Sequence, residues 1–246
     1  MTLPTWPQLI SAGWSLLYPS VCQLCGENRA EPTEGYVCRS CRDGVKFIEP
    51  PFCAVCGLPA AGQITHDYTC SNCREQPWDF SSARGATVAE GAIREAIHRY
   101  KYHRALWFEP FLCQYLLERA LPELQGQAWD AVVPVPLYPV KEREREFNQA
   151  ERLGRQLALA LQIPLQTRWV KRVEPTEQQA RLSRKDRLAN MRRAFAPATE
   201  TKIPGARIVV VDDVLTTGAT TSAVAAVLKD LGADTVCVWA VARAVS

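Results

Sequence analysis

The sequence lacks the features that would insert it into a membrane or mark it for export. Its early apolar run, residues 9–17, is too short to span a bilayer. No Lys or Arg precedes that run and no small-residue cleavage site follows it, so we expect no signal peptide. The sequence therefore predicts an apolar arm or docking helix over residues 1–21, no membrane insertion, and a cytoplasmic protein.

Two common phosphate-binding signatures are also missing. The chain contains neither a Gly-x-x-x-x-Gly-Lys loop nor a Gly-x-Gly-x-x-Gly turn, which excludes the P-loop and the dinucleotide fingerprint. No helix-turn-helix pattern is apparent. Any phosphate site in this chain must therefore be built from a different pattern.

Net charge is small and unevenly distributed. The formal charge is +3, but residues 1–80 carry five Lys or Arg against eight Asp or Glu, while the remainder carries 24 against 18. The basic excess therefore lies outside the N-terminal third. An anionic substrate explains it most economically, and single-stranded nucleic acid is the second explanation.

Cysteine, in contrast, is abundant: eight of the ten lie in four Cys-x-x-Cys knuckles. In a reducing compartment such pairs indicate metal before disulfides. Two knuckles together complete a closed tetrahedral site, so eight ligands predict two structural Zn²⁺ ions. The predicted ligands are Cys22, Cys25, Cys38, Cys41, Cys53, Cys56, Cys70 and Cys73.

The pairing of the knuckles has more than one solution. Consecutive pairing, with one ion at residues 22–41 and the other at 53–73, is the simplest, and a cross-braced arrangement stays open. Iron–sulfur ligation and a thioredoxin-like redox pair are the chemical rivals. His66 could replace one cysteine, although an exposed loop histidine is the simpler interpretation. Residues 22–74 are too few for a sizeable core, so we expect metal binding to supply their folding energy.

After a linker at residues 75–82, the chain has the pattern of an α/β domain over residues 83–246. Short β-branched runs alternate with amphipathic stretches, and Cys113 and Cys237 fall at apolar positions. The expected strands are 84–88, 130–137, 207–213 and 236–241, with 165–173 as a strand or extended segment. The expected helices follow residue 90 and cover 107–121, 147–161 and 222–232.

One stretch, residues 207–221, organises the rest. A buried strand ends in Asp212 and Asp213, and a hydroxyl-rich turn leads into a helix. The turn is Thr216, Thr217, Gly218, Ala219 and Thr220, whose N–H groups can cradle an anion near the helix N-terminus. Carboxylates repel phosphate but accept hydrogen bonds from a cis-diol, so we expect a ribose at the acids and a 5′-phosphate in the turn. The alternative is a structural strand whose acids cap a helix or hold a lone Mg²⁺.

Two basic segments accompany this stretch. Lys141, Arg143 and Arg145 follow the strand that ends in Pro136 and Leu137, at the same predicted sheet edge. Because Glu residues interleave with these bases, a solvated charge run explains them equally well. The second basic segment, residues 176–193, could close over a bound anion as a lid or contact nucleic acid. No aromatic residue lies between residues 171 and 193, which lowers the case for base stacking by this segment. Its candidate residues are Gln179, Arg184, Arg187 and Asn190.

Residues 207–221 resemble the 5-phosphoribosyl-1-pyrophosphate (PRPP) motif of type I phosphoribosyltransferases. From about residue 22 onward the chain resembles the ComF family of competence proteins, through the double zinc ribbon and the segments 97–102, 133–137 and 145–150. The resemblance implies a type I phosphoribosyltransferase-like parallel sheet flanked by helices, and a role in natural transformation and DNA uptake. It also implies PRPP with Mg²⁺ as ligand, contacted by Asp212, Asp213, residues 216–220, Lys101, Pro136, Leu137, Arg143 and Arg145.

Three functions fit this pattern. The first is an enzyme or former enzyme that binds PRPP and transfers or recognises a phosphoribosyl group. The second is a module that binds the 5′-phosphate of single-stranded DNA and docks on an uptake helicase or channel protein through its ribbons. The third, a PRPP-sensing regulator, ranks lowest. Glu146 and Ala194 stand where the ComF family usually has glycine, which restricts backbone approach to a ligand there.

Overall fold

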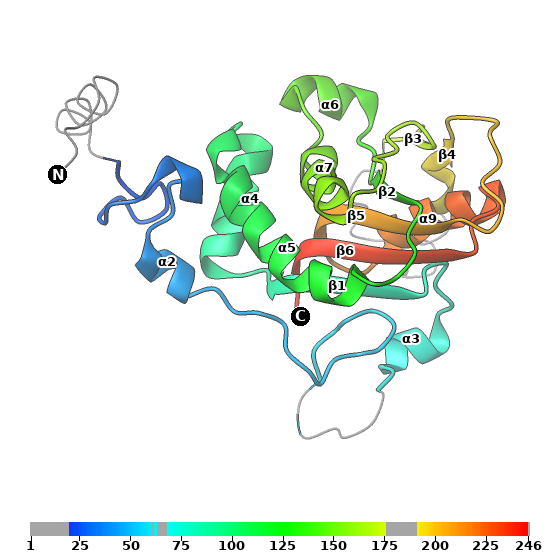
Figure 1. Ribbon diagram of the computed structural model, residues 1–246, viewed down its shortest axis with the longest axis horizontal. Coiled ribbons are helices and arrows are strands. Elements are labelled where there is room, and N and C mark those ends of the chain that lie inside the picture. Colours follow the sequence, from blue (N-terminus) through cyan, green and yellow to red (C-terminus); the bar gives the residue numbers. More distant parts are fainter. Residues whose placement is uncertain (1–19, 61, 63–67, 176–190, 246) are drawn as a thin grey trace.

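The computed structural model describes residues 20–60, 62, 68–175 and 191–245. Its centre is a four-stranded sheet in the order β1-β6-β5-β2, in which every neighbouring pair is parallel (Figure 1). The strands are β1 (Ser82–Val88), β2 (Ala131–Pro134), β5 (Arg207–Leu215) and β6 (Thr235–Arg243). The predicted α/β class with a parallel sheet is confirmed.

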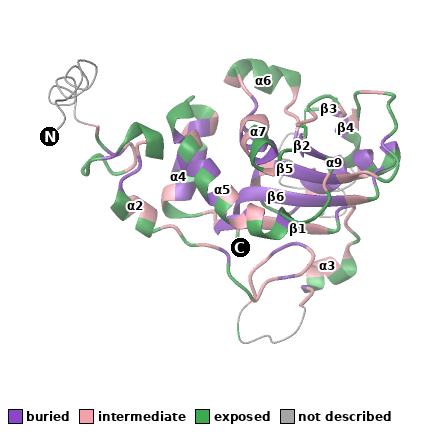
Figure 2. Cartoon of the chain, viewed as in Figure 1, coloured by how far each residue is buried: buried purple, intermediate pink, exposed green. Residues whose placement is uncertain are grey.

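Helices cover both faces of this sheet because the strands carry apolar residues on both sides. Val209 and Val211 face the helices α4 (Gly91–Tyr102), α5 (Glu109–Leu124) and α7 (Gln149–Leu161). Ile208 and Val210 face α9 (Ala219–Leu231) on the opposite side. Figure 2 shows the strands as the most continuously buried part of the chain.

Several element boundaries differ from the prediction. The segment after β2 forms a helix, α6 (Pro139–Arg145), where we predicted basic residues at the sheet edge or a solvated charge run but no helix. Pro139 fits its first turn, and Glu146 ends it in the left-handed conformation. A short helical turn, η2 (Leu106–Phe108), precedes α5, so that helix begins later than expected. The extended segment at 165–173 contributes β3 (Val170–Arg172) and an isolated parallel bridge between Leu165 and Val132. β3 pairs antiparallel with β4 (Phe195–Pro197), a strand that we did not predict.

The two zinc ribbons repeat one local plan. In each, the first cysteine of the second knuckle is the N-cap of a five-residue helix: Cys38 for α2 (Arg39–Asp43) and Cys70 for α3 (Ser71–Glu75). The first ribbon also contains the short turn η1 (Pro32–Glu34). Gly26 and Gly57 directly follow the first knuckle of their ribbons, and both have positive φ, as a tight turn requires.

The chain between the ribbons runs along the outer edge of β1. Ile48 N donates to Ala86 O at 3.1 Å, and Val88 N donates to Lys46 O at 2.9 Å. On the other outer strand, Val132 N donates to Pro164 O and Gln166 N donates to Val132 O. Ala83 N of β1 also donates to Val55 O at 2.7 Å, so other segments of the same chain are hydrogen-bonded to both outer strands of the sheet.

Some predictions concern residues outside the described part. These are the N-terminal arm up to residue 19, His66, and the four candidates Gln179, Arg184, Arg187 and Asn190. Among the described residues, no helix has both the length and the apolarity to cross a bilayer.

Candidate functional site

The eight knuckle cysteines form two compact clusters, each with its four sulfur atoms within 4.8 Å of one another. One cluster is Cys22, Cys25, Cys38 and Cys41, and the other is Cys53, Cys56, Cys70 and Cys73. Consecutive pairing is therefore confirmed, and the cross-braced alternative is wrong. Three Sγ–Sγ distances are 3.8 Å, the edge expected of a tetrahedron with Zn–S bonds of about 2.3 Å. Both sets of ligands fit structural zinc.

Backbone N–H groups support the two metal sites in the same way. Cys22 Sγ accepts from Leu24 N and Cys38 N, both at 3.4 Å. Cys53 Sγ accepts from Cys56 N at 3.5 Å and Cys70 N at 3.4 Å. Donors to sulfur stabilise the thiolate form that binds metal and fix the orientation of the ligand.

The second cluster has two further donors from outside the ribbon. Arg243 at the end of β6 is 4% exposed, and its Nη2 donates to Cys56 Sγ at 3.5 Å. Burial lowers the pKa of Arg243, while the neighbouring thiolates oppose that shift. Trp78 Nε1 donates to Cys73 Sγ at 3.2 Å. The second metal site is thus continuous with the sheet.

The paired acids end β5 at the carboxyl edge of the sheet, where open α/β sheets bind ligands. Successive strand residues point to opposite faces, so Asp213 lies on the α4 side and Asp212 on the α9 side. Asp213 forms an ion pair with Lys101 at the end of α4, and the two side chains are 3% and 19% exposed. Burial alone would raise the pKa of Asp213, but the Lys101 ammonium holds it below its usual value.

Asp212 has the opposite electrostatic setting. It is half-buried, and its Oδ1 accepts from Asp213 N at 2.9 Å. Burial raises its pKa well above the ordinary value, and the charge of Asp213 adds to that shift. Burial lowers the pKa of Arg172 on β3, and the negative charge of Asp212 opposes that shift. We did not predict Arg172 as a site residue, although it is a base in the predicted extended segment at 165–173.

The turn after the acids leads directly into the N-terminus of α9. Gly218 is the N-cap of α9 with φ +87°, a conformation that favours glycine. Thr221 Oγ1 donates to Gly218 O at 3.0 Å, while Thr216 and Thr217 are exposed. The positive end of a thirteen-residue helix therefore meets an accessible turn.

A segment that we predicted as linker packs beneath this turn. Trp78 and Phe80 are stacked with ring centroids 5.4 Å apart, and Phe80 is buried. Asp79 accepts a hydrogen bond from Ser222 on α9 at 2.9 Å and pairs with Arg192 at 2.6 Å. An acid between two aromatic residues was the available sequence signal for such packing.

The predicted basic partners lie on and around α6. Arg143 is exposed on that helix. Arg145 stacks over Tyr102 at 5.0 Å and donates to Gln149 Oε1 at 2.9 Å. Pro136 and Leu137 are half-buried after β2. Glu146, at the position usually occupied by glycine, has φ +67° and pairs with Arg104.

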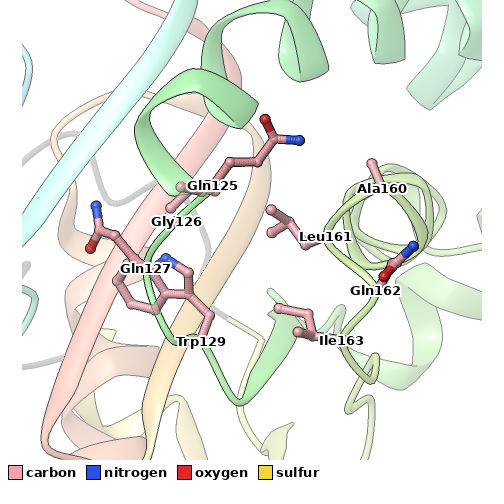
Figure 3. A pocket seen from close by; sticks show the side chains of 9 residues that line it. Gln125, Gly126, Gln127, Trp129, Ala160, Leu161, Gln162 and Ile163 are labelled. Carbon is pink, nitrogen blue, oxygen red and sulfur yellow. The ribbon is translucent and has the colours of Figure 1, made fainter.

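A hollow of about 300 Å³ lies at the opposite, amino edge of the sheet, between the ends of α5 and α7 (Figure 3). It is lined by Trp129 and neighbours such as Gln125 and Gln162, and none of its nine lining residues is charged. Two helix C-termini meet there, and these carry partial negative charge. The hollow therefore does not suit a phosphate.

These features define the class: an α/β protein with an N-terminal pair of Cys₄ zinc sites and an anion-compatible turn at its sheet edge. A double zinc ribbon domain family matches residues 14–76. Competence protein F of Haemophilus influenzae is 35% identical over 85% of this chain and 90% of that protein. The DNA utilization protein YhgH of Escherichia coli K12 is 32% identical over 93% of this chain and 99% of that protein. The chain belongs to the competence protein F (ComF) family.

A solved structure of adenine phosphoribosyltransferase from Thermoanaerobacter pseudethanolicus also matches. It is 20% identical, covers 65% of this chain and 78% of its own, and has a TM-score of 0.35. A likeness at this level adds nothing on ligand or activity.

Proposed function

We propose that this protein binds PRPP, or another ligand with a 5′-phosphoribosyl group, at the β5–α9 turn, and that it works in DNA uptake or utilization. The proposal rests mainly on one observation: Asp212, Asp213 and the turn at Gly218 lie together at the carboxyl end of β5. Two relatives are named for competence and for DNA utilization, which supports the cellular context.

The turn suits the 5′-phosphate. Its exposed hydroxyls at Thr216 and Thr217 precede a helix N-terminus without a side-chain cap. Ala219 N donates to Thr217 Oγ1 at 3.4 Å, so we assign the phosphate to the N–H groups that follow it in the first turn of α9. Gly218 leaves no side chain between that anion and the backbone.

The acids suit the ribose, with different roles. Asp213 is engaged by Lys101 and fixes the position of that ammonium. Asp212, which retains access to solvent, is the carboxylate proposed to accept from the ribose hydroxyls. In a transferase, pyrophosphate would leave C1 of PRPP through a positively charged ribosyl transition state, which the two carboxylates favour electrostatically.

The pyrophosphate leaving group needs cationic partners. In this proposal Mg²⁺ arrives with PRPP, and it neutralises charge on the leaving group. Arg143 and Arg145 on α6 follow the carboxyl end of β2, the same edge of the sheet as the acids. We assign them, with Lys101, to the pyrophosphate end of the ligand.

Calorimetric titration with PRPP and Mg²⁺ tests the ligand. The wild type should bind, and Asp212→Asn should weaken binding at least about tenfold because a charged acceptor is lost. Asp212→Asn is preferable to Asp213→Ala, which would leave Lys101 buried without its partner. Pyrophosphate release against a panel of bases then tests for transfer and identifies the acceptor.

The matched control is Asp234→Asn. Asp234 is exposed and immediately precedes β6, at the opposite edge of the sheet. The Asp234→Asn substitution changes the net charge by the same amount as Asp212→Asn but should leave the affinity for PRPP unchanged. Absence of binding by the wild type at millimolar PRPP would overturn the proposal.

A second candidate is a non-catalytic module that holds the terminal 5′-phosphate of single-stranded DNA and docks on an uptake helicase or channel protein through its ribbons. The names of the relatives and the phosphate chemistry of the turn favour it. A 5′-phosphorylated oligonucleotide should then bind more tightly than its 5′-hydroxyl twin, compete with PRPP, and weaken with salt and with Arg184→Ala. Equal affinity for the two oligonucleotides would exclude this candidate.

A further inference from the structure

A continuous path of contacts joins the second zinc ribbon to the β5–α9 turn. Trp78 Nε1 donates to Cys73 Sγ at 3.2 Å. The indole ring is stacked on Phe80 with an interplanar angle of 11°. A Cβ atom placed on Gly218 would lie 3.5–3.6 Å from both rings. The two aromatic rings therefore form the floor beneath the turn.

The residue between those rings is fastened to the first turn of α9. Asp79 N donates to Ser222 Oγ at 3.2 Å, and Ser222 Oγ donates to Asp79 Oδ2 at 2.9 Å. Arg192 donates to both carboxylate oxygens at 2.6 Å. These hydrogen bonds of Asp79 hold the neighbouring rings of Trp78 and Phe80 against Gly218.

Within the turn, the side-chain hydrogen bonds are local: Ala219 N donates to Thr217 Oγ1 at 3.4 Å, and Thr221 Oγ1 donates to Gly218 O at 3.0 Å. Gly218 is the residue with the least conformational restriction, and as N-cap it offers no side-chain acceptor to α9. An anion cradle works only when several N–H groups keep a common direction. Rigid aromatic packing from below supplies that restraint.

We propose that Trp78 is a positioning residue through which zinc in the second ribbon holds the β5–α9 turn in its anion-binding shape. The identity of the anion rests on the proposed function, whereas the contact path does not. Coupling between two sites is reciprocal. An anion bound in the turn therefore slows the loss of zinc from the second cluster and leaves the first cluster unaffected.

Hydrogen exchange at residues 214–222 tests the path in the zinc-loaded, ligand-free full chain. Trp78→Ala removes both the N–H donor to Cys73 and the indole ring that packs beneath Gly218. It should speed hydrogen exchange at residues 214–222 about tenfold or more. Trp78→Phe keeps a ring but loses the donor to Cys73, and should give a smaller increase. Trp107→Phe, on η2 beside the first ribbon, is the matched control and should match the wild type.

Zinc release to a chelator tests the reciprocal effect. The probe is Mg²⁺ with PRPP, and inorganic phosphate is the second probe. In Cys25→Ser protein, which retains the second cluster intact, either anion should slow release of the remaining zinc severalfold. The same anions should not slow release from a Cys53→Ser protein, which retains the first cluster.

The outcomes separate this inference from the proposed function. Wild-type exchange rates in both Trp78 variants would overturn the positioning role, whatever the ligand is. A wild type that binds no PRPP would overturn the proposed function, while the exchange comparison would still decide the role of Trp78. If Trp78→Ala fails to fold, faster exchange in folded Trp78→Phe supports the inference and unchanged exchange overturns it.

Discussion

The two Cys₄ clusters have the same ligands in the same order, but they attach to the α/β domain differently. The first ribbon packs against helices: Val37 is buried in the same core cluster as Phe111 of α5, and Tyr115 on α5 donates to Arg42 O. The second ribbon contacts strands and the candidate site, through Arg243 on β6 and through Trp78. Identical metal chemistry therefore serves a ribbon docked on helices in one case and a ribbon joined to the sheet and the candidate site in the other.

Removing one zinc ligand from each ribbon should separate the two roles most strongly. Cys56→Ser also deprives buried Arg243 of its acceptor, a change that costs about 3–5 kcal/mol when a buried pair is broken. Cys25 is exposed, so Cys25→Ser should release one zinc yet leave the main unfolding transition within about 1 kcal/mol. Zinc content and thermal unfolding by circular dichroism measure both. Equal losses of stability would contradict the difference in attachment.

The two glycines after the first knuckles give a matched pair with a smaller effect. Both have positive φ, so alanine costs about 1–2 kcal/mol of backbone strain at either position. A Cβ on Gly57 would also lie 2.5 Å from Ala83 O of β1, whereas nothing lies within 4 Å at Gly26. We expect Gly57→Ala to be less stable than Gly26→Ala by about 1–3 kcal/mol in urea unfolding. Similar values for the two variants would mean that the first knuckle of the second ribbon is free to move away from β1.

Substitution of the arginine beside each cluster should change metal affinity in only one ribbon. Arg243→Gln removes a charged donor to Cys56 Sγ and should weaken zinc binding by about 10- to 100-fold. Arg42 donates to backbone carbonyl groups and not to sulfur, so Arg42→Gln should leave zinc affinity unchanged. Competition with a chromophoric chelator gives both affinities. A weaker first site in Arg42→Gln protein would weigh against the comparison.

The smallest expected effect concerns the docking of the first ribbon. Tyr115 donates to Arg42 O at 3.3 Å, a long hydrogen bond. Tyr115→Phe should therefore cost only about 0.5–1 kcal/mol. Tyr138→Phe, at the start of α6, serves as control. A loss of several kcal/mol in Tyr115→Phe would show that this hydrogen bond matters more to the docking of the first ribbon than its length suggests.

Local patterns made much of this molecule predictable. Cys-x-x-Cys spacing identified the metal ligands because two thiolates of one knuckle can share an ion. β-branched runs identified the strands. The predicted helix start near Asn148 is confirmed, because Asn148 is the N-cap of α7 and its side chain accepts from Ala150 N at 2.9 Å. Gly218 was predicted from the need for close backbone approach and has the expected positive φ.

What the sequence did not reveal depends on contacts between distant segments. Asp79 and Ser222 are 143 residues apart, so a composition typical of a linker concealed the support beneath the turn. The pairing of Lys101 with Asp213 similarly requires the α4 helix end to lie over β5. α6 was not predicted because alternating charges after Pro139 fit a solvated segment and an exposed helix equally well.

The short segment from Lys46 to Ile48 has a further consequence for the behaviour of fragments. It occupies N–H and C=O groups of β1 that would otherwise be open to another chain. In a fragment that began at Ser82, these N–H and C=O groups at the outer edge of β1 would have lost their hydrogen-bond partners. We expect such a fragment to self-associate through that strand.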